Sequence, residues 1–376
     1  MMRDLKRIRG CLVGGAVGDA LGYAVEFSRL SEIVSKYGEE GITRYDLVRG
    51  LARISDDTQM ALFTATALLF GETRGRMRGI GAGPVGYFDR AYLDWYQTQN
   101  HSYPLRNRDG HVSWLVNCKE MFSCRAPGGT CLSALQAGGH GTVESPINHS
   151  KGCGGVMRVA PIGAYLAGKR GWEVEEADMA GAEAAAVTHG HELGYIPSAA
   201  LVHIVYMLAT AEKPDIREAV LSSMETMPRL FPNAAHMQEF LDLMQRAVDL
   251  SAQDMNERDA IRALGEGWVA EETLAIAVYC ALKHPDDFEK AVIASVNHDG
   301  DSDSTGAVTG NILGAALGYD AIPAYYLDKL ELRQIIEEIA DDLYRDCQID
   351  EYSSGDDPVW LSKYVRIDYT PANEAK

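Results

Sequence analysis

Three aspartates occupy alternate positions in the stretch "HDGDSDSTG", at Asp299, Asp301 and Asp303. Carboxylates this close repel one another unless a cation or a proton neutralises them. The spacing is not that of an EF-hand calcium loop, because Ser304 stands where that loop needs glycine and Gly310 where it needs glutamate. A metal site of another kind is one interpretation of the motif, and capping of the following helix is the other.

A second group of acidic and hydroxyl side chains precedes another apolar run, in "ISDDTQMALFTATALL". Ser55, Asp56, Asp57 and Thr58 stand directly before residues with helical periodicity. The sequence therefore predicts two helix N-termini, far apart along the chain, that both carry oxygen ligands. Such ligands suit Mg²⁺ or Mn²⁺, whereas zinc favours His or Cys. If the two ends converge, they can hold two cations about 3.5–4 Å apart and activate a water; independent capping is the alternative.

A glycine-rich segment, "NHSKGCGGVMRVAPIG", starts at Asn148 and leads into an apolar stretch. Its successive backbone N–H groups are suited to bind phosphate, although the segment lacks the G-K-[ST] of a P-loop. A tight turn is the alternative interpretation. Further along, His189 and His191 in "THGHELGY" are two residues apart. On a helix they would point to different faces, which argues against both ligating one metal.

Most of the chain has the composition and periodicity of α-helix. We expect helices over three segments in particular: Ala184–Thr210, Glu271–Lys283 and Asp328–Asp346. The nearest candidate for a strand is Tyr45–Ile54. We expect a single domain over residues 1–365 and a frayed C-terminal tail over residues 366–376.

Glycines recur every fourth residue in two segments, one near each end of the chain. The first glycine ridge is Gly10, Gly14, Gly18 and Gly22, and the second is Gly306, Gly310, Gly314 and Gly318. Glycine inside a helix costs roughly 1 kcal/mol relative to alanine. A spacing of four aligns the glycines along one face, where another helix can approach closely. We predict that the two ridges pack against each other at the centre of a helical domain; the alternative is that each faces a different helix.

The net charge and the cysteine content of the chain disfavour some kinds of partner and cofactor. It has 376 residues and a net charge of −19. A field of that sign disfavours nucleic acid and anionic membranes as partners. The seven cysteines include no C-x-x-C pair, which disfavours a zinc site and indicates a reducing compartment. We therefore expect a cytoplasmic protein without a nucleic-acid or membrane partner.

Together, these segments resemble the ADP-ribosylglycohydrolase family, which includes the dinitrogenase reductase-activating glycohydrolases and the ADP-ribosyl-acceptor hydrolases. "GDALGYAVEF" is similar to the family's opening G-D-x-x-G-x-x-x-E, and "SDDT" and "GDSDST" are similar to its two metal motifs. "GCGGVMRVAPIG" is similar to its ligand loop, and "THGHELGY" to its T-H-x-x-x-L-G-Y. The motifs stand in the family's order and extend from Gly10 to Gly318.

The resemblance implies an all-α fold, a single compact domain of orthogonal helices with a dinuclear metal cleft. It also implies a hydrolase that uses two Mg²⁺ or Mn²⁺ ions. The expected substrates are ADP-ribosylated proteins or small molecules that contain ADP-ribose.

The resemblance assigns roles to individual residues. The implied metal ligands are Ser55, Asp56, Asp57, Asp301, Asp303 and Ser304. The implied catalytic residues are Asp56, Asp57, Glu26 and Asp303. The implied substrate-binding residues are Gly152, Cys153, Gly154, Gly155, Met157 and His189. Glu26 would be a mobile acid near the metals and Asp303 the bridge between them, whereas Asp299 and Thr305 fall outside the pattern and are expected to cap.

The ligand loop departs from the motif that is usual in the family it resembles. Many relatives carry N-G-[SA]-L-M-R, whereas this chain has C-G-G-V-M-R, beginning at Cys153. Lys151, just before the loop, is positioned by sequence to add a phosphate contact. The segment from Gly71 to Asn148 is less familiar, and we expect it either to shape the rim of the site or to pack as surface.

The spelling of the two metal motifs is closer to the arginine-directed branch of the family. We therefore expect N-linked ADP-ribosyl-arginine as the substrate, and an acidic rim would attract its cationic guanidinium group. The alternatives are O-linked ADP-ribose, as in ADP-ribosyl-serine or O-acetyl-ADP-ribose, and a non-catalytic protein that binds ADP-ribose. The intact set of aspartates favours an active enzyme.

Overall fold

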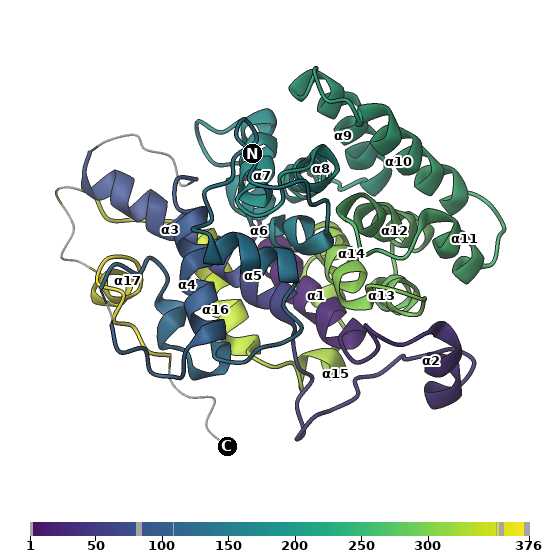
Figure 1. Cartoon of the computed structure of the whole chain (residues 1–376), viewed down its shortest axis with the longest axis horizontal. Helices are drawn as coiled ribbons and strands as arrows, with labels where there is room; N and C mark the ends of the chain where they lie inside the picture. The colour runs from purple at the N-terminus through teal and green to yellow at the C-terminus, as the bar shows by residue number, and fades with distance from the viewer. Residues whose placement is uncertain (1–2, 80–84, 108, 351, 353–356, 372–376) are drawn as a thin grey trace.

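The chain folds into α-helices joined by loops and short 3₁₀ turns, and the fold class is all-α (Figure 1). The computed structural model describes residues 3–79, 85–107, 109–350, 352 and 357–371. The first helices are α1 (Leu5–Gly22), α2 (Leu30–Tyr37), α3 (Asp56–Met77), α4 (Phe88–Asn100), α5 (Gly129–Gln136) and α6 (Ala160–Leu166). The next are α7 (Val174–Ala186), α8 (Glu192–Thr210), α9 (Ile216–Leu230), α10 (Met237–Ser251), α11 (Glu257–Leu264) and α12 (Ala270–Lys283). The last are α13 (Phe288–Val296), α14 (Ser302–Leu317), α15 (Ala324–Leu327), α16 (Arg333–Arg345) and α17 (Pro358–Tyr364).

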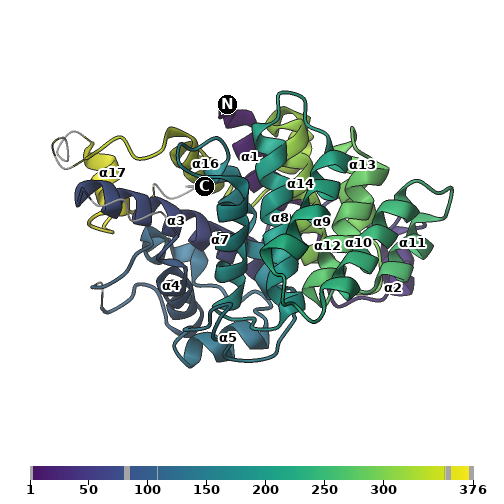
Figure 2. The same ribbon diagram turned by 90° about the horizontal axis from the view of Figure 1, so that it is seen from above.

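Helices α1 and α14 pack against each other near the centre of the molecule, through their glycine faces (Figures 1 and 2). A Cβ atom added at Gly14 would lie 2.5 Å from the carbonyl oxygen of Gly310, and one at Gly18 would lie 1.9 Å from that of Gly306. A methyl group does not fit at these distances, so the two backbones touch where side chains would hold them apart. The prediction that the two ridges face each other is confirmed.

The antiparallel pairing of these helices brings two of their ends together. A Cβ atom added at Gly22 would lie 2.1 Å from the carbonyl oxygen of Ser302, so the last residue of α1 meets the first residue of α14. Glu26 follows α1 closely, and Asp303 lies in the first turn of α14. The glycine contact therefore brings these two carboxylates to one end of the helix pair.

The remaining helices extend to both sides of this pair. Helices α3, α4 and α17 lie on one side and α9 to α13 on the other, while α8 lies between them (Figures 1 and 2). A continuous hydrophobic core extends from Ile8 in α1 to Tyr364 in α17. Among the described residues, only α8 is long and apolar enough to cross a membrane, and 83% of its apolar window is buried inside the protein. Core packing accounts for a helix that is apolar on all sides.

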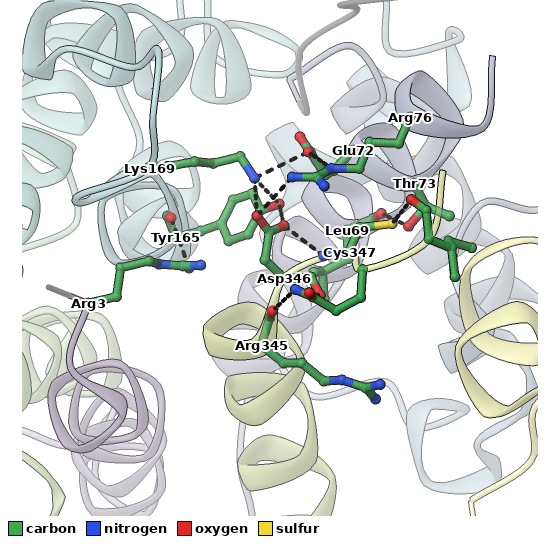
Figure 3. Close-up of polar contacts among 12 residues, drawn as sticks. Arg3, Leu69, Glu72, Thr73, Arg76, Tyr165, Lys169, Arg345, Asp346 and Cys347 are labelled. Atoms are coloured by element: carbon green, nitrogen blue, oxygen red, sulfur yellow. Dashed lines mark hydrogen bonds and ion pairs between the residues drawn. The ribbon is translucent and has the colours of Figure 1, made fainter. Parts of the chain in front are cut away.

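Partly buried charges join distant parts of the chain in the Asp346 network, which we define as Glu72, Arg76, Tyr165, Lys169 and Asp346 (Figure 3). One oxygen of Asp346, the C-cap residue of α16, lies 2.5 Å from Lys169 Nζ. The other accepts a 2.6 Å hydrogen bond from the Tyr165 hydroxyl. Lys169 also lies 3.3 Å from Glu72 on α3, which pairs with Arg76. The network ties α3, α6 and α16 together, and each of its carboxylates faces a cation.

The predicted helices are confirmed in part. Helix α12 covers the predicted Glu271–Lys283 segment. The single helix predicted over Ala184–Thr210 is two helices, because the chain turns at residues 187–191 and His191 caps α8. The helix predicted from Asp328 begins only at Arg333, after a residue with a left-handed backbone.

The strand candidate is wrong, and the predicted tail is described only in part. Within the described chain, Tyr45–Ile54 is a loop that forms only isolated β-bridges. The described part of the expected tail, residues 366–371, is held in place: the Tyr369 ring packs edge-on against Trp114, and its hydroxyl donates to Glu338 at 2.7 Å. Residues 372–376 lie outside the described residues.

Candidate metal centre and ligand loop

The N-terminus of α14 carries the three-aspartate motif. Asp301 is the N-cap residue: its side chain accepts the Ser304 N–H at 3.3 Å, and its own N–H donates to the Glu266 carbonyl oxygen at 2.8 Å. Asp303, in the first turn, accepts the same Ser304 N–H at 2.9 Å. Both aspartates are 2% exposed. The helix end therefore combines capping with the burial of two carboxylates.

The two residues expected to cap have different roles. Asp299 accepts the Leu30 N–H at 2.7 Å and so caps the first turn of α2 instead of α14. Thr305 is not a cap, because its hydroxyl lies 2.7 Å and 2.9 Å from the carbonyl oxygens of Ser295 and Asp301. A threonine inside the first turn reaches back to preceding carbonyl groups, so the capping prediction is wrong for Thr305.

The N-terminus of α3 is organised by Asp19, a residue to which the sequence analysis gave no role. The Asp19 carboxylate accepts the Ser55 N–H at 2.9 Å and the Thr58 N–H at 3.1 Å, and it also accepts the Thr58 hydroxyl. The Ser55 hydroxyl oxygen, at the N-cap, accepts the Asp57 N–H at 3.2 Å. Asp19 on α1 therefore fixes the start of α3. Its signal in the sequence is the G-D of the opening motif.

The starts of α3 and α14 converge with the segment that follows α1. Three carboxylates there have ligand oxygens within 4.8 Å of one another, and we define them as the acidic cluster: Glu26, Asp301 and Asp303. Asp56 and Asp57 are buried beside this cluster, and the Asp57 side chain contacts that of Ser304. The fold therefore brings the two predicted metal-binding motifs together, with Glu26 in the tightest group.

Burial and mutual repulsion change the protonation of these carboxylates. The pKa of Glu26 rises to about 9, because burial and the neighbouring Asp301 and Asp56 disfavour its charged form. Burial also raises the pKa of Asp303 well above its usual value, and the charges of Asp57 and Asp301 add to the effect. The pKa values of Asp56 and Asp57 are raised for the same reasons. Without another positive charge, the site holds protons.

The chemistry of these donors fits a hard divalent cation. Glu26 Oε2 and Asp57 Oδ2 are buried and have no hydrogen-bond partner. Within the described chain, no ion pair joins a lysine, arginine or histidine to the acidic cluster, and the nearby Arg125 pairs with Glu331 instead. Carboxylate and hydroxyl oxygens are ligands that Mg²⁺ and Mn²⁺ prefer. The residues are therefore suited to hold such ions.

The predicted ligand loop runs from Gly152 into a 3₁₀ turn, Cys153–Arg158, and lies against His189. A Cβ atom added at Gly154 would lie 2.9 Å from His189 Cε1, so a side chain there would displace the imidazole. His189 is 2% exposed, and its Nδ1 lies 2.8 Å from the Thr188 hydroxyl. Burial lowers the pKa of His189 to about 3. The neutral His189 ring therefore packs against the glycines of the loop.

Arg158 is a fully buried cation behind this loop, and the sequence analysis did not single it out. Its guanidinium donates to the Ala184 carbonyl oxygen at 2.9 Å and to the Thr188 hydroxyl at 2.7 Å. It also lies 4.1 Å from the centroid of the Tyr92 ring. These contacts hold the C-terminus of α7 and the turn that carries His189. The signal was a charged residue inside an apolar stretch.

Three other residues from the sequence analysis can now be located. Met157 is 3% exposed and lines a small internal cavity with Asp57, so it lies behind the loop. Lys151, expected to contact phosphate, is paired with the buried Glu271. His191 caps α8 while His189 lies under the loop, so the two histidines do not face one site.

A cavity of about 550 Å³ has Asp299, Glu266 and Trp268 in its wall. Its lining includes no member of the acidic cluster and no residue of the ligand loop. The Trp268 ring stacks on the exposed ring of Phe27, with 6.0 Å between the centroids. The volume is in the range of small-ligand sites, but the residues that line the cavity are not those predicted to bind ADP-ribose.

The family model described as ADP-ribosylglycohydrolase matches residues 1–352. The chain belongs to the ADP-ribosylglycohydrolase family. A solved structure described as an ADP-ribosylglycohydrolase-related protein complex matches with a TM-score of 0.56 and 25% identity, covering 91% of this chain and 98% of that one. Family and fold therefore agree with the order of the motifs.

Two curated relatives extend this result. ADP-ribosylhydrolase ARH3 of Bos taurus is 24% identical over 390 residues, covering 91% of this chain and 93% of that protein. ADP-ribosylarginine hydrolase Tri1 of Serratia proteamaculans (strain 568) is 27% identical over 350 residues, covering 91% and 80%. This ADP-ribosylglycohydrolase is thus an enzyme of ADP-ribosyl hydrolysis, and the acidic cluster is its candidate metal centre.

Proposed function

We propose that this ADP-ribosylglycohydrolase releases ADP-ribose from N-linked ADP-ribosyl-arginine on proteins, with two Mg²⁺ or Mn²⁺ ions as cofactors. The observation that carries the proposal is the acidic cluster, a group of buried carboxylates without a protein cation where two helix N-termini meet. The residues that would hold the ions are Ser55, Asp56, Asp57, Asp301, Asp303 and Ser304. Asp303, at the centre of the converging motifs, would bridge them.

When bound, the cations supply positive charge that activates a water and binds the ribose hydroxyls. Glu26, Asp56 and Asp57 orient this water towards C1″ of the distal ribose. Glu26 accepts the proton of the water at Oε2, an oxygen that no other group of the described protein occupies. The hydroxyl group of the water forms the new bond to C1″, and the proton passes to the departing guanidine nitrogen.

Cleavage of the bond at C1″ builds positive charge on the ribose ring. The carboxylates of Asp56, Asp57 and Asp303, which stand in the first turns of α3 and α14, would stabilise this charge. Repulsion among these carboxylates is thereby reduced as the charge develops. The same groups thus bind cations and favour the transition state.

The ligand loop holds the ADP-ribose. The residues that would line it are Gly152, Cys153, Gly154 and Gly155. The Cys153 N–H donates to the Trp268 carbonyl oxygen, so the backbone N–H groups of Gly154 and Gly155 are the ones offered to a diphosphate. His189 supports the loop from below, and Met157 packs behind it. The absence of side chains at the glycines lets the ligand approach the backbone closely.

Two observations favour arginine as the acceptor. Tri1, a relative over 91% of this chain, is named an ADP-ribosylarginine hydrolase. The net charge of −19 attracts a guanidinium group and the basic surface around it. We further propose that the enzyme acts on proteins in the cytoplasm, which the absence of a disulfide among its seven cysteines supports.

The test is the release of free ADP-ribose from two substrates, an ADP-ribosyl-arginine protein and an ADP-ribosyl-serine peptide. Each is measured with Mg²⁺, with Mn²⁺ and with a chelator, alongside Asp303→Ala. Metal-dependent release from the arginine substrate, lost in the variant, supports both the centre and the acceptor. Release from serine alone overturns the acceptor, and release that persists in the chelator overturns the metal centre.

A further inference from the structure

Three apolar side chains are exposed together in the loop that precedes α3. Leu47, Val48 and Leu51 are 41%, 42% and 42% exposed, and none of them packs against the described hydrophobic core. The segment that carries them projects from the body of the molecule beside α15 (Figure 1). Single exposed apolar residues are common on protein surfaces, whereas several at one place are typical of an interaction site.

The backbone of this segment forms a tight hairpin. The Val48 N–H donates to the Leu51 carbonyl oxygen at 2.9 Å, and the Leu51 N–H donates to the Val48 carbonyl oxygen at 3.3 Å. Arg49 and Gly50, between them, have φ angles of 56° and 86°, and two-residue hairpin turns favour such positive values. We define residues 47–51 as the apolar hairpin. A partner meets its side chains on a turn that is already formed, which lowers the entropic cost of binding.

The base of the apolar hairpin is anchored in the protein. Ala52 and Ile54 are 1% and 0% exposed. The Ala52 N–H donates to the Lys329 carbonyl oxygen at 2.8 Å, and the Ala52 carbonyl oxygen accepts the Glu331 N–H at 3.0 Å. The Glu331 carboxylate accepts the Ile54 N–H at 3.2 Å and pairs with Arg125. These bonds hold the hairpin at a fixed position relative to the start of α3.

The apolar hairpin also lies close to the candidate metal centre along the chain. Ser55 and Asp56, two of the residues proposed to hold the ions, follow Leu51 by four and five positions. Five residues span at most about 18 Å when fully extended, so Leu51 lies within that distance of Asp56. An arginine side chain is short, and its ADP-ribose must reach the metal centre. The protein that carries this arginine therefore has to bring its surface close to the hairpin.

We propose that the apolar hairpin docks the protein that carries the ADP-ribosyl-arginine, through an apolar patch beside the modified side chain. The inference rests on the proposed function and adds to it a surface that recognises the protein part of the substrate. Free ADP-ribosyl-arginine has the same linkage but lacks a protein surface that could contact the hairpin. The hairpin therefore favours modified proteins over small molecules.

The experiment compares the release of ADP-ribose from a protein modified at arginine and from free ADP-ribosyl-arginine. The double variant Val48→Ser/Leu51→Ser removes two apolar side chains of the hairpin and keeps the backbone bonds of its turn. We expect it to raise KM for the protein roughly tenfold, as the loss of an important apolar contact in an interface does. Its kcat for the protein, and both constants for free ADP-ribosyl-arginine, should not change. The matched control is Met255→Ser/Val359→Ser, at residues elsewhere in the chain that are 41% and 55% exposed.

Three results would overturn the inference. The first is a KM for the modified protein that is the same in the hairpin variant and the wild type. The second is an equal loss with both substrates, which would show that the substitutions disturb the site itself. The third is a wild-type dimer, seen by analytical ultracentrifugation, that the hairpin variant separates into monomers. In that case a second copy of the chain covers the hairpin.

A binding measurement separates this inference from the proposed function. The Kd of the modified protein for the metal-free enzyme is measured with the wild type and with both double variants. If the wild type releases ADP-ribose from neither substrate, the proposed function is wrong. A Kd that rises roughly tenfold in the hairpin variant alone would still support the docking surface. An unchanged Kd, or no binding to the wild type, would overturn it.

Discussion

Two groups of carboxylates in this enzyme, one partly buried and one buried, are neutralised in different ways. In the Asp346 network, burial alone would raise the pKa of Asp346, but Lys169 and Tyr165 hold it below its usual value (Figure 3). In the acidic cluster, burial and neighbouring carboxylates raise the pKa of Glu26 to about 9. The protein supplies cations to the first group from its own side chains, whereas no side chain of the described residues pairs as a cation with the second.

The difference separates a structural role from a functional one. A carboxylate that joins helices is most useful when its partner is permanent, as Lys169 is for Asp346. A carboxylate that binds an exchangeable cation must leave the place of that cation open. Unpartnered oxygens such as Glu26 Oε2 cost stability in the metal-free protein, and that cost is offset only when the cation binds.

The largest expected effect comes from Asp303→Asn. We expect release of ADP-ribose to fall below detection, a greater loss than the about 10–100-fold typical of removing an outer partner of a metal ligand. The same change should raise the melting temperature of the metal-free protein, because it removes a carboxyl group that must take up a proton to be buried among its acidic neighbours. Asp299→Asn, in the same loop but outside the cluster, is the matched control for activity. Full activity of Asp303→Asn would contradict the functional role given to the acidic cluster.

Removal of a carboxylate from the Asp346 network is expected to destabilise the protein and to leave its activity unchanged. Asp346→Asn should lower the free energy of unfolding by about 1.5–3 kcal/mol, because it weakens a charge-assisted hydrogen bond to Lys169 that is only partly buried. Release of ADP-ribose at a temperature where the variant is folded should be unchanged. Urea denaturation and the release assay measure the two quantities. A stabilised Asp346→Asn protein would mean that the two groups of carboxylates do not differ as described.

Addition of metal should stabilise the enzyme through the acidic cluster and not through the Asp346 network. At a concentration of Mn²⁺ about 100 times its Kd, the free energy of unfolding should rise by about 2.7 kcal/mol. Asp303→Asn should reduce this gain, whereas Asp346→Asn should keep it. Thermal melts with and without Mn²⁺ provide the measurement, and an equal gain in both variants would argue against binding at the cluster.

A further expected effect is a dependence of stability on pH. The pKa of Glu26 rises from 4.5 to about 9 on folding, so between these values the folded state binds more protons than the unfolded state. The contribution of Glu26 to stability is therefore present below about pH 4.5 and is lost as the pH rises towards 9. Glu26→Gln should flatten this part of the profile in metal-free protein. An unchanged slope in that variant would show that Glu26 is not the titrating group.

Much of the candidate site followed from local patterns. The acidic motifs at Asp56 and Asp301 stand at helix N-termini, and the known preference for Ser, Thr and Asp at such positions allowed both helix starts to be predicted. The pairing of the two glycine ridges could be predicted for another reason. A helix face made of glycine has little explanation other than the close approach of another helix. The roles of Asp19 and Arg158 were not predicted, since each depends on which distant backbone groups the fold brings to it.

The sequence by itself determined the helical class, the family motifs, the two acidic motifs at helix N-termini and the pairing of α1 with α14. It determined these because helical periodicity, capping preferences and the four-residue spacing of glycine are properties of neighbouring positions in the chain. Only the tertiary structure decided that Glu26 joins Asp301 and Asp303 in one group, and that no side chain of the described protein pairs with them as a cation. Burial and electrostatic interaction depend on distances across the fold, and residues far apart in the chain acquire those distances only when the helices pack.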